Sequence, residues 1–204
     1  MSPVRTPSAP RSWQQRIRES RLGTVLVLGV TAAIVMGGAY LVDRPAAAQA
    51  GTTTVKLSGT GDGPEPKVGS LTQDFRATTV DGKQVSLGSY KGQPVWLTFG
   101  ASWCAACVAE APDVQAAYQK FKAKGVVVLA VFISEDSGTV RDYAGRVGLT
   151  FPKIADPNTR IASVYRVYGI PAHFFLDRSG VLRSVKTGGL SPEQMASALT
   201  EISR

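Results

Sequence analysis

The sequence predicts an α/β domain over residues 70–204, with a central mixed β-sheet flanked by helices. Short apolar runs rich in strand-forming residues alternate there with stretches of helical length and helical periodicity. The run at 126–133 is apolar almost throughout, as expected of a central strand covered on both faces. A hydrophobic content of 44% in 204 residues also argues against disorder of the whole chain.

The expected elements are bounded by residues that start or stop regular structure. Asp81-Gly82 separates the first two strands and is a strong hairpin signal. Pro112 interrupts the first helix and should kink it, and Gly125 fits its C-terminus. Ser191 fits the N-cap of the last helix. In chain order we expect strands at 74–80, 83–87 and 94–99, a helix at 104–124, a strand at 126–133, helices at 137–147 and 159–165, strands at 172–176 and 181–186, and a helix at 192–203.

The N-terminal part carries the signals of a membrane anchor. Residues 1–21 hold five arginines and one glutamate, so this arm supplies +4 of the chain's net charge of +8. Residues 22–42 contain no charge, and about 20 apolar residues cross a hydrocarbon core of roughly 30 Å. Because the positive charges precede the run, we expect one transmembrane helix at 22–42 in the cell membrane, with a cytoplasmic N-terminus and an extracytoplasmic domain.

A cleaved signal peptide is the alternative interpretation of this segment. Ala48-Gln49-Ala50 resembles an A-x-A cleavage site, although the apolar run is longer than the usual run of about 7–15 residues. Both interpretations export the domain from the cytoplasm. Residues 43–69 are small, polar and rich in Gly and Pro, which predicts a flexible linker.

The charge of the remaining chain does not indicate nucleic-acid binding. Residues 64–204 carry 16 basic and 12 acidic side chains, and the two signs are interspersed. A nucleic-acid interface would need clustered Lys and Arg with aromatic residues or a known motif. We therefore expect no nucleic-acid partner.

Two cysteines and one histidine limit the chemistry of the chain. Two cysteines cannot build a disulfide framework or a four-cysteine zinc site, and Val108 replaces the histidine that a C-x-x-C-H haem attachment site needs. Half of a zinc site with His173, or a structural disulfide, are the alternatives for Cys104 and Cys107. A disulfide loop this short would stabilise the fold little. We expect a redox-active pair with no cofactor and no metal.

The spacing of Cys104 and Cys107 suits such a pair. Residues three apart share one face of a helix, so the two thiols can form a disulfide. A cysteine at a helix N-terminus lies beside unpaired backbone N–H groups, which stabilise the thiolate and lower its pKa. We expect Cys104 to be an exposed nucleophile and Cys107 to be a more buried resolving thiol.

The cysteine motif and a distant proline together resemble a known family. Trp103-Cys-Ala-Ala-Cys follows an expected strand, and Gly169-Ile170-Pro171 precedes another, which looks like a thioredoxin fold. The segment from Trp103 to Pro112 reads W-C-x-x-C-x-x-E-x-P and resembles the TlpA/ResA-like branch of that fold. The apolar strand followed by Asp177-Arg-Ser-Gly180, the N-terminal hairpin and the exported anchor also fit this branch. The resemblance covers about residues 66–203.

The resemblance implies a role for each matching residue. Cys104 would attack and Cys107 would resolve, while Pro171 would follow a cis peptide bond and face the pair. Backbone groups of Ile170 could then pair with an extended substrate chain, and Trp103 would also contact substrate. Glu110 would tune the ionisation of the thiols and their proton transfer.

Three positions affect which family properties can be expected of this chain. Ala106 stands where the branch often has proline, and residues between the cysteines help set the redox potential. Thr98 occupies the place of the buried acid of thioredoxins and cannot act as a base near neutral pH, which favours Glu110 for that role. His173, two residues after Pro171, is interpreted as a packed or partly exposed strand residue rather than a catalyst.

These observations predict a membrane-anchored thiol-disulfide oxidoreductase that reduces disulfides of exported proteins. The resemblance suggests apocytochrome c as one example of a substrate. It also implies a DsbD/CcdA-like membrane protein as the electron donor. Insertion of disulfides would use the same residues and differ only in potential.

Two rival functions come from other classes. A peroxiredoxin-like peroxidase would need a Thr-x-x motif before its cysteine, whereas Ala101 lies three residues before Cys104 and Trp103 precedes it. A binding module with a vestigial site fits poorly with an intact cysteine pair and Pro171.

Overall fold

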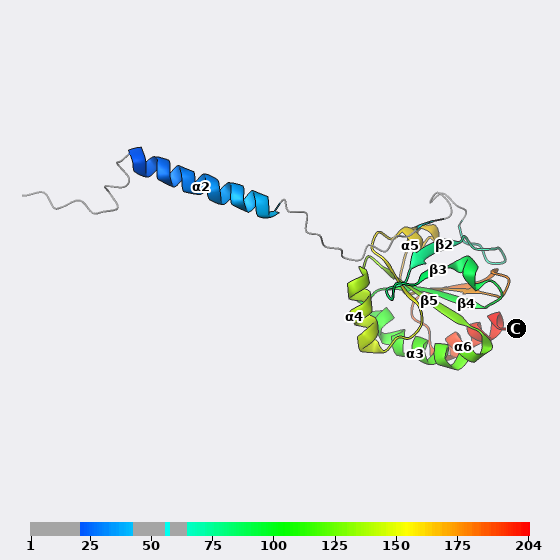
Figure 1. The fold of residues 1–204 in the computed structure, drawn as a ribbon. Coiled ribbons are helices and arrows are strands. Elements are labelled where there is room, and N and C mark those ends of the chain that lie inside the picture. Colours follow the sequence, from blue (N-terminus) through cyan, green and yellow to red (C-terminus); the bar gives the residue numbers. More distant parts are fainter. Residues whose placement is uncertain (1–20, 43–55, 58–64) are drawn as a thin grey trace, which may run out of the picture. The chain divides into compact units, whose positions relative to one another are not determined.

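The computed structural model describes residues 21–42, 56–57 and 65–204 of the chain. It divides into two compact units, residues 1–48 and 49–204, and each is described by itself. The first unit contains helix α2, Arg21–Val42, which matches the helix expected at 22–42 (Figure 1). Large apolar side chains of α2, among them Val25, Leu28 and Ile34, are exposed. Among the described residues, we find no helix that is both long and apolar enough to cross a membrane.

A mixed sheet of five strands forms the centre of the second unit. Its strand order is β6-β5-β4-β7-β8, with β4, β5 and β6 parallel to one another and β7 and β8 antiparallel to their neighbours. The strands are β4 Val95–Gly100, β5 Val127–Ile133, β6 Lys153–Asp156, β7 Ala172–Leu176 and β8 Leu182–Thr187. The mixed central sheet predicted from the sequence is therefore confirmed.

A smaller antiparallel sheet contains the predicted hairpin. Strands β2, Phe75–Thr78, and β3, Gln84–Ser86, pair on either side of the Asp81-Gly82 turn, and Gly82 adopts a positive φ of 82°. A further strand, β1, Lys56–Leu57, pairs with β2 although residues 43–69 were expected to be linker. Composition misses β1 because ladder hydrogen bonds join backbone groups and need no large apolar side chain.

In the described residues of this unit, four helices match the expected ones closely. They are α3 Ala105–Phe121, α4 Ser137–Val147, α5 Arg160–Val164 and α6 Pro192–Ile202. Two 3-10 turns accompany them, Leu87–Tyr90 and Lys122–Lys124. Helix α3 continues across Pro112, so this proline does not end the helix. Ser191 caps α6 by accepting a hydrogen bond from the Gln194 backbone N–H.

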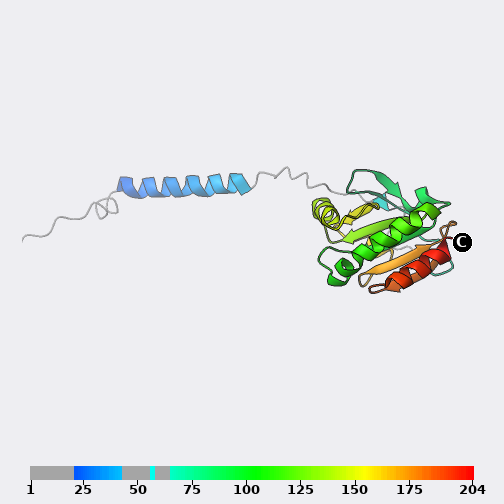
Figure 2. The same ribbon diagram turned by 90° about the horizontal axis from the view of Figure 1, so that it is seen from below.

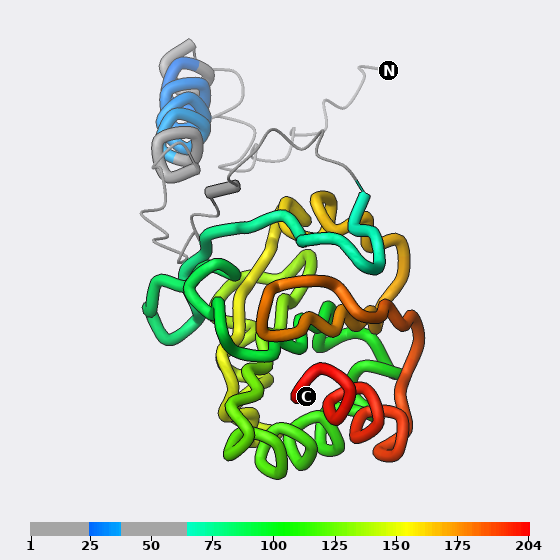
Figure 3. The backbone as a smooth tube through the Cα atoms, turned by 90° about the vertical axis from the view of Figure 1, so that its right-hand side faces the viewer, coloured from blue at the N-terminus to red at the C-terminus, as the bar shows by residue number. Residues whose placement is uncertain are grey.

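The central sheet separates two hydrophobic cores because successive side chains of a strand point to opposite faces. Trp96, Val128 and Phe175 belong to the core that also contains buried residues of α3, α4 and α6. Leu97 and Leu129, one residue further along their strands, belong to the core shared with β2 and α5. Helices α3 and α6 lie side by side over one face (Figure 2), and the β2–β3 hairpin and α5 lie on the other side (Figure 3).

Strand β6 is the one element of the central sheet that the sequence analysis missed. Its four residues are all buried, yet two of them, Lys153 and Asp156, are charged, so the segment lacks an apolar pattern. Lys153 Nζ donates to the Leu149 carbonyl at 3.2 Å. The Asp156 carboxylate accepts the backbone N–H groups of Arg160 at 2.8 Å and Ala162 at 3.0 Å, which holds the start of α5. Partners from other parts of the fold thus pair with these two charged side chains, which a hydrophobic pattern would not have assigned to a buried strand.

Candidate active site

The two cysteines lie where β4 passes into α3. Cys104 is the N-cap of α3, with extended backbone angles, and its Sγ accepts a hydrogen bond from the Cys107 N–H at 3.2 Å. The two residues form a disulfide with a Cα–Cα distance of 5.2 Å, as the spacing predicted. Because Sγ of Cys104 already accepts a helix N-terminal N–H group, the same position stabilises a thiolate when the disulfide is reduced.

The exposure of the two cysteines differs from the expectation in one respect. Cys104 is 9% exposed and Cys107 is 8% exposed, so Cys104 is not the openly exposed thiol that was expected. The neighbouring loop explains this burial, since partly buried Ile133 and Ile170 pack against the disulfide. Trp103, in contrast, is 61% exposed and borders the pair.

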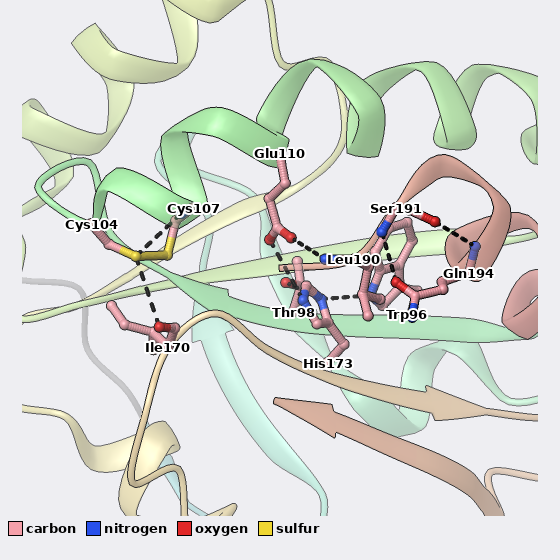
Figure 4. Close-up of polar contacts among 10 residues, drawn as sticks. All are labelled: Trp96, Thr98, Cys104, Cys107, Glu110, Ile170, His173, Leu190, Ser191 and Gln194. Atoms are coloured by element: carbon pink, nitrogen blue, oxygen red, sulfur yellow. Dashed lines mark hydrogen bonds and ion pairs between the residues drawn. A yellow bond between two sulfur atoms is a disulfide. The ribbon is translucent and has the colours of Figure 1, made fainter. Parts of the chain in front are cut away.

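The loop before β7 brings Pro171 to the cysteines. The Ile170–Pro171 peptide bond is cis, which confirms the expected conformation. The Ile170 carbonyl oxygen lies 3.9 Å from Cys104 Sγ (Figure 4). Residues 66 positions apart in sequence are thereby placed in contact, and the backbone of the cis loop borders the sulfur that is expected to react.

Glu110 lies one helical turn beyond Cys107 on the same face of α3. Its side chain is buried, 8% exposed, and Oε2 accepts the Leu190 backbone N–H at 3.1 Å (Figure 4). Burial raises the pKa of Glu110 to about 7; the Leu190 hydrogen bond lowers it, and the nearby Asp113 raises it further. A carboxyl group with this pKa can both accept and return a proton near neutral pH.

A small cavity of about 40 Å³ lies beside both Glu110 and Cys107. Cys107, Glu110, Thr98 and Gly100 are among the residues that line it. A buried water needs a volume of at least about 10–15 Å³ and two or more polar partners, so this cavity is large enough for one. Such a water would connect the Cys107 sulfur with the Glu110 carboxylate.

His173 is a site residue that the sequence analysis did not assign. It is fully buried, pairs with Thr98 across β4 and β7, and lies with Nε2 3.5 Å from Glu110 Oε1. Nδ1 accepts the Trp96 indole N–H at 3.3 Å and lies 3.0 Å from Thr98 Oγ1. The alternation of side chains along a strand could have indicated this position. His173 and Phe175 are two residues apart and therefore point to the same face of β7, which α3 and α6 cover.

The loop that carries Trp103 is attached to the end of β5. The buried Glu135 carboxylate accepts the Ser102 backbone N–H at 2.9 Å and also the Ser102 hydroxyl. Glu135 was not identified from the sequence, because its partner is 33 residues away. It holds the start of the cysteine loop from the short segment between β5 and α4.

These features together define a thiol-disulfide exchange site on a thioredoxin-like fold. A reduced Cys104 can attack a disulfide beside the cis loop, Cys107 can close the disulfide again, and Glu110 can take up the proton that Cys107 loses. Within the described part of the chain, no three His, Cys, Asp or Glu side chains are grouped as a metal site would require.

Comparison with known proteins agrees with this class. The AhpC/TSA family matches residues 68–185. Thiol-disulfide oxidoreductase ResA of Geobacillus kaustophilus is 34% identical over 135 residues, which cover 66% of this chain and 78% of ResA. The Bacillus anthracis ResA is 31% identical over 136 residues, or 67% of this chain and 79% of that protein. The chain belongs to the AhpC/TSA family and is a TlpA/ResA-like thiol-disulfide oxidoreductase of the thioredoxin superfamily.

Solved structures support the same fold. A thiol:disulfide interchange protein of Chlorobium tepidum has a TM-score of 0.62 at 24% identity, covering 68% of this chain and 99% of its own. StoA of Bacillus subtilis has a TM-score of 0.56 at 27% identity, with 63% and 97% covered. A secreted Mycobacterium tuberculosis disulfide oxidoreductase homologous to Escherichia coli DsbE has a TM-score of 0.57 at 25% identity, with 62% and 95% covered.

Proposed function

We propose that the chain is a disulfide reductase that acts on exported proteins. The observation that carries the proposal is the position of the Cys104 sulfur, at the N-terminus of α3 and 3.9 Å from the Ile170 carbonyl oxygen. This position stabilises the thiolate and borders a backbone edge along which an extended chain could bind. The direction, reduction rather than oxidation, follows from the TlpA/ResA-like resemblance.

The proposed reaction moves two electrons and two protons. The Cys104 thiolate attacks one sulfur of the substrate disulfide, and the other substrate sulfur leaves and takes up a proton. The Cys107 thiol then gives its proton to Glu110 and attacks the Cys104 sulfur of the mixed disulfide. The second substrate sulfur leaves and takes up a proton, and the Cys104–Cys107 disulfide seen in the structure is formed.

Apocytochrome c cysteines before haem attachment are the substrate class that the resemblance favours. The oxidised pair must then be reduced again, and a DsbD/CcdA-like membrane protein would supply the electrons. The test is the redox state of the pair in cells, measured by alkylation of free thiols. Loss of the donor should leave the pair oxidised and should block cytochrome c maturation, whereas an unchanged redox state would contradict this donor.

We also propose that the domain lies outside the cytoplasm. The basic arm at 1–21 and the uncharged run at 22–42 support export, whether the segment stays as an anchor or is cleaved after Ala50. Labelling of a single engineered surface cysteine in a Cys104→Ala/Cys107→Ala chain, with a reagent that cannot cross the membrane, tests the location. The mass of the mature protein then distinguishes anchor from cleaved signal. Labelling only after lysis would contradict the proposal.

The direction is tested by the reduction potential of the purified protein in glutathione buffers. A reductase should have a potential at or below about −250 mV, while a value near about −120 mV identifies a disulfide-inserting oxidant. The substrate is tested by trapping. A Cys107→Ala variant should accumulate mixed disulfides through Cys104, and the matched Cys104→Ala variant should trap none. Equal trapping by both variants would contradict the assigned roles.

A further inference from the structure

The polar groups behind Glu110 extend the exchange site into the core. From the cysteines inward they are Glu110 on α3, His173 on β7, and Thr98 and Trp96 on β4 (Figure 4). His173 and Trp96 are both 0% exposed, and Thr98 is 8% exposed. Burying a polar side chain without a partner lowers the stability of the fold, so the contacts among these four side chains contribute to stability.

The donors around His173 determine which of its nitrogens carries the proton. The Trp96 indole N–H can only donate, so Nδ1 must act as an acceptor for it at 3.3 Å. A neutral imidazole that accepts at Nδ1 carries its hydrogen on Nε2. Burial lowers the pKa of His173 to about 4, with an opposing contribution from Gly188, so the ring is neutral near pH 7.

Nε2 of His173 faces Glu110 Oε1 and forms no hydrogen bond among the described residues, although the Gly188 backbone also interacts with the ring. The distance to Oε1 is 3.5 Å, and a shift of about 0.5 Å would give an ordinary N–H···O hydrogen bond. The other carboxylate oxygen, Oε2, is already fixed by the Leu190 N–H at 3.1 Å. The two oxygens of Glu110 are thus approached from two different elements, β7 and the segment before α6.

We propose that His173 is a positioning residue that presents Nε2–H to Glu110 Oε1 and holds the carboxylate beside Cys107. Trp96 sets the tautomer, His173 orients Glu110, and Glu110 exchanges the proton of Cys107 through the cavity. His173 itself contacts neither thiol nor substrate in this arrangement. A hydrogen bond donated to the carboxylate favours its charged form, which is the form that accepts the Cys107 proton.

The other groups around Glu110 must be considered for its titration. Asp113 on α3 raises the pKa of Glu110. Tyr143 on α4 interacts with the Glu110 charge, and Cys107 lies one turn before it on α3. The Gly188 backbone, just after β8, also interacts with His173 and so competes with Glu110 for the imidazole N–H. None of these groups is changed by substitution of His173.

Two substitutions separate positioning from packing. His173→Asn keeps an acceptor near Nδ1 for Trp96 and removes the donor that faces Glu110. His173→Gln places an amide donor near the position of Nε2. Phe175→Leu is the control for packing, because Phe175 is fully buried on the same face of β7 and stacks on Trp96 at 5.3 Å.

The first readout is the titration of Glu110 in the oxidised full chain, followed by ¹³C NMR of its carboxyl carbon. Glu110→Gln assigns the signal, and no thiol titrates in this form. His173→Asn should move the midpoint upward by about one pH unit, as expected for loss of one hydrogen bond to a carboxylate. His173→Gln and Phe175→Leu should leave it within about 0.3 unit.

The second readout is kinetic. The chain is prepared with glutathione disulfide-linked to Cys104, and release of glutathione by Cys107 is followed against pH. At about pH 7 the rate should fall about fivefold in His173→Asn and recover in His173→Gln.

An unchanged Glu110 midpoint in His173→Asn would overturn the proposal and assign Nε2–H to Gly188 instead. A shift shared by Phe175→Leu would also overturn it, because packing alone would then suffice. Neither readout depends on the physiological substrate or on the direction of exchange.

Discussion

The free energy of unfolding depends on pH through Glu110 and through His173, and the two dependences have opposite signs. Folding raises the pKa of Glu110 from 4.5 to about 7, so between these values the folded state binds a proton that the unfolded state has lost. The free energy of unfolding therefore falls as pH rises through this window. Folding lowers the pKa of His173 from 6.5 to about 4, so the unfolded state binds the additional proton and the free energy of unfolding rises over that window. The two slopes oppose each other where the windows overlap.

Removing either group should expose the slope of the other. In Glu110→Gln, the free energy of unfolding should rise between pH 4 and 6.5. In His173→Asn it should fall from pH 4.5 up to the Glu110 midpoint, which this substitution raises about one unit above 7. Each slope is at most about 1.4 kcal/mol per pH unit. Urea denaturation of the oxidised chain at several pH values measures both. Parallel curves for the two variants would contradict the assigned pKa directions.

Trp103 affects substrate binding more than stability. Its side chain is 61% exposed beside the cysteines, and exposed substitutions usually change stability by no more than about 0.5 kcal/mol. Trp103→Ala should raise KM for a protein disulfide about fivefold or more, because exposed aromatic residues often dominate such contacts. The melting temperature and the rate with a small aromatic disulfide serve as controls. An equal loss with both substrates would indicate a damaged cysteine site instead.

At the scale of elements, the connection between β5 and α4 supports the cysteine loop through Glu135. Its carboxylate accepts two hydrogen bonds from the part-buried Ser102, and donors left unpaired away from water cost up to about 1–3 kcal/mol each. Glu135→Ala should lower stability by about 2 kcal/mol and slow disulfide exchange at Cys104. Denaturant titration and stopped-flow exchange measure the two effects.

Asp136 provides the matched control for Glu135. It is exposed, and its carboxylate caps α4 by accepting the Thr139 N–H at 2.9 Å and the Thr139 hydroxyl at 3.1 Å instead of binding Ser102. Asp136→Ala should cost about 1 kcal/mol of stability and leave the exchange rate unchanged. If both variants slow exchange in proportion to their loss of stability, the support assigned to Glu135 is wrong.

At the scale of the whole molecule, the two cores share one sheet and should unfold together. Leu199 of α6 and Ile161 of α5 are each 0% exposed, in the cores on opposite faces. Leu199→Ala and Ile161→Ala should each lower stability by about 2–5 kcal/mol. Fluorescence and far-ultraviolet circular dichroism should report one coincident transition for residues 49–204 in both variants. Separate transitions would mean that the two faces fold independently.

The sequence predicted much of this architecture from local signals. The Asp81-Gly82 hairpin, the apolar strand at 126–133 and the glycine that ends the α3 region at Gly125 are short-range features. The same holds for the Cys104–Cys107 disulfide, which depends only on helical spacing. Strand β6 could not be predicted in this way, because its buried Lys153 and Asp156 are satisfied by partners that only the folded chain brings near.

By itself, the sequence determined the class of fold, the exchange chemistry and the two cysteines that perform it. These depend on residue spacing, which is local, and on a proline motif similar to that of known relatives. Tertiary structure alone decided that Cys104 is nearly buried and that His173 faces Glu110 from another strand. The register of β4 against β7 places Thr98 opposite His173, and α3 then covers that face with Glu110. The ionisation of Glu110 follows from this burial, a property of the packed molecule that no local sequence pattern contains.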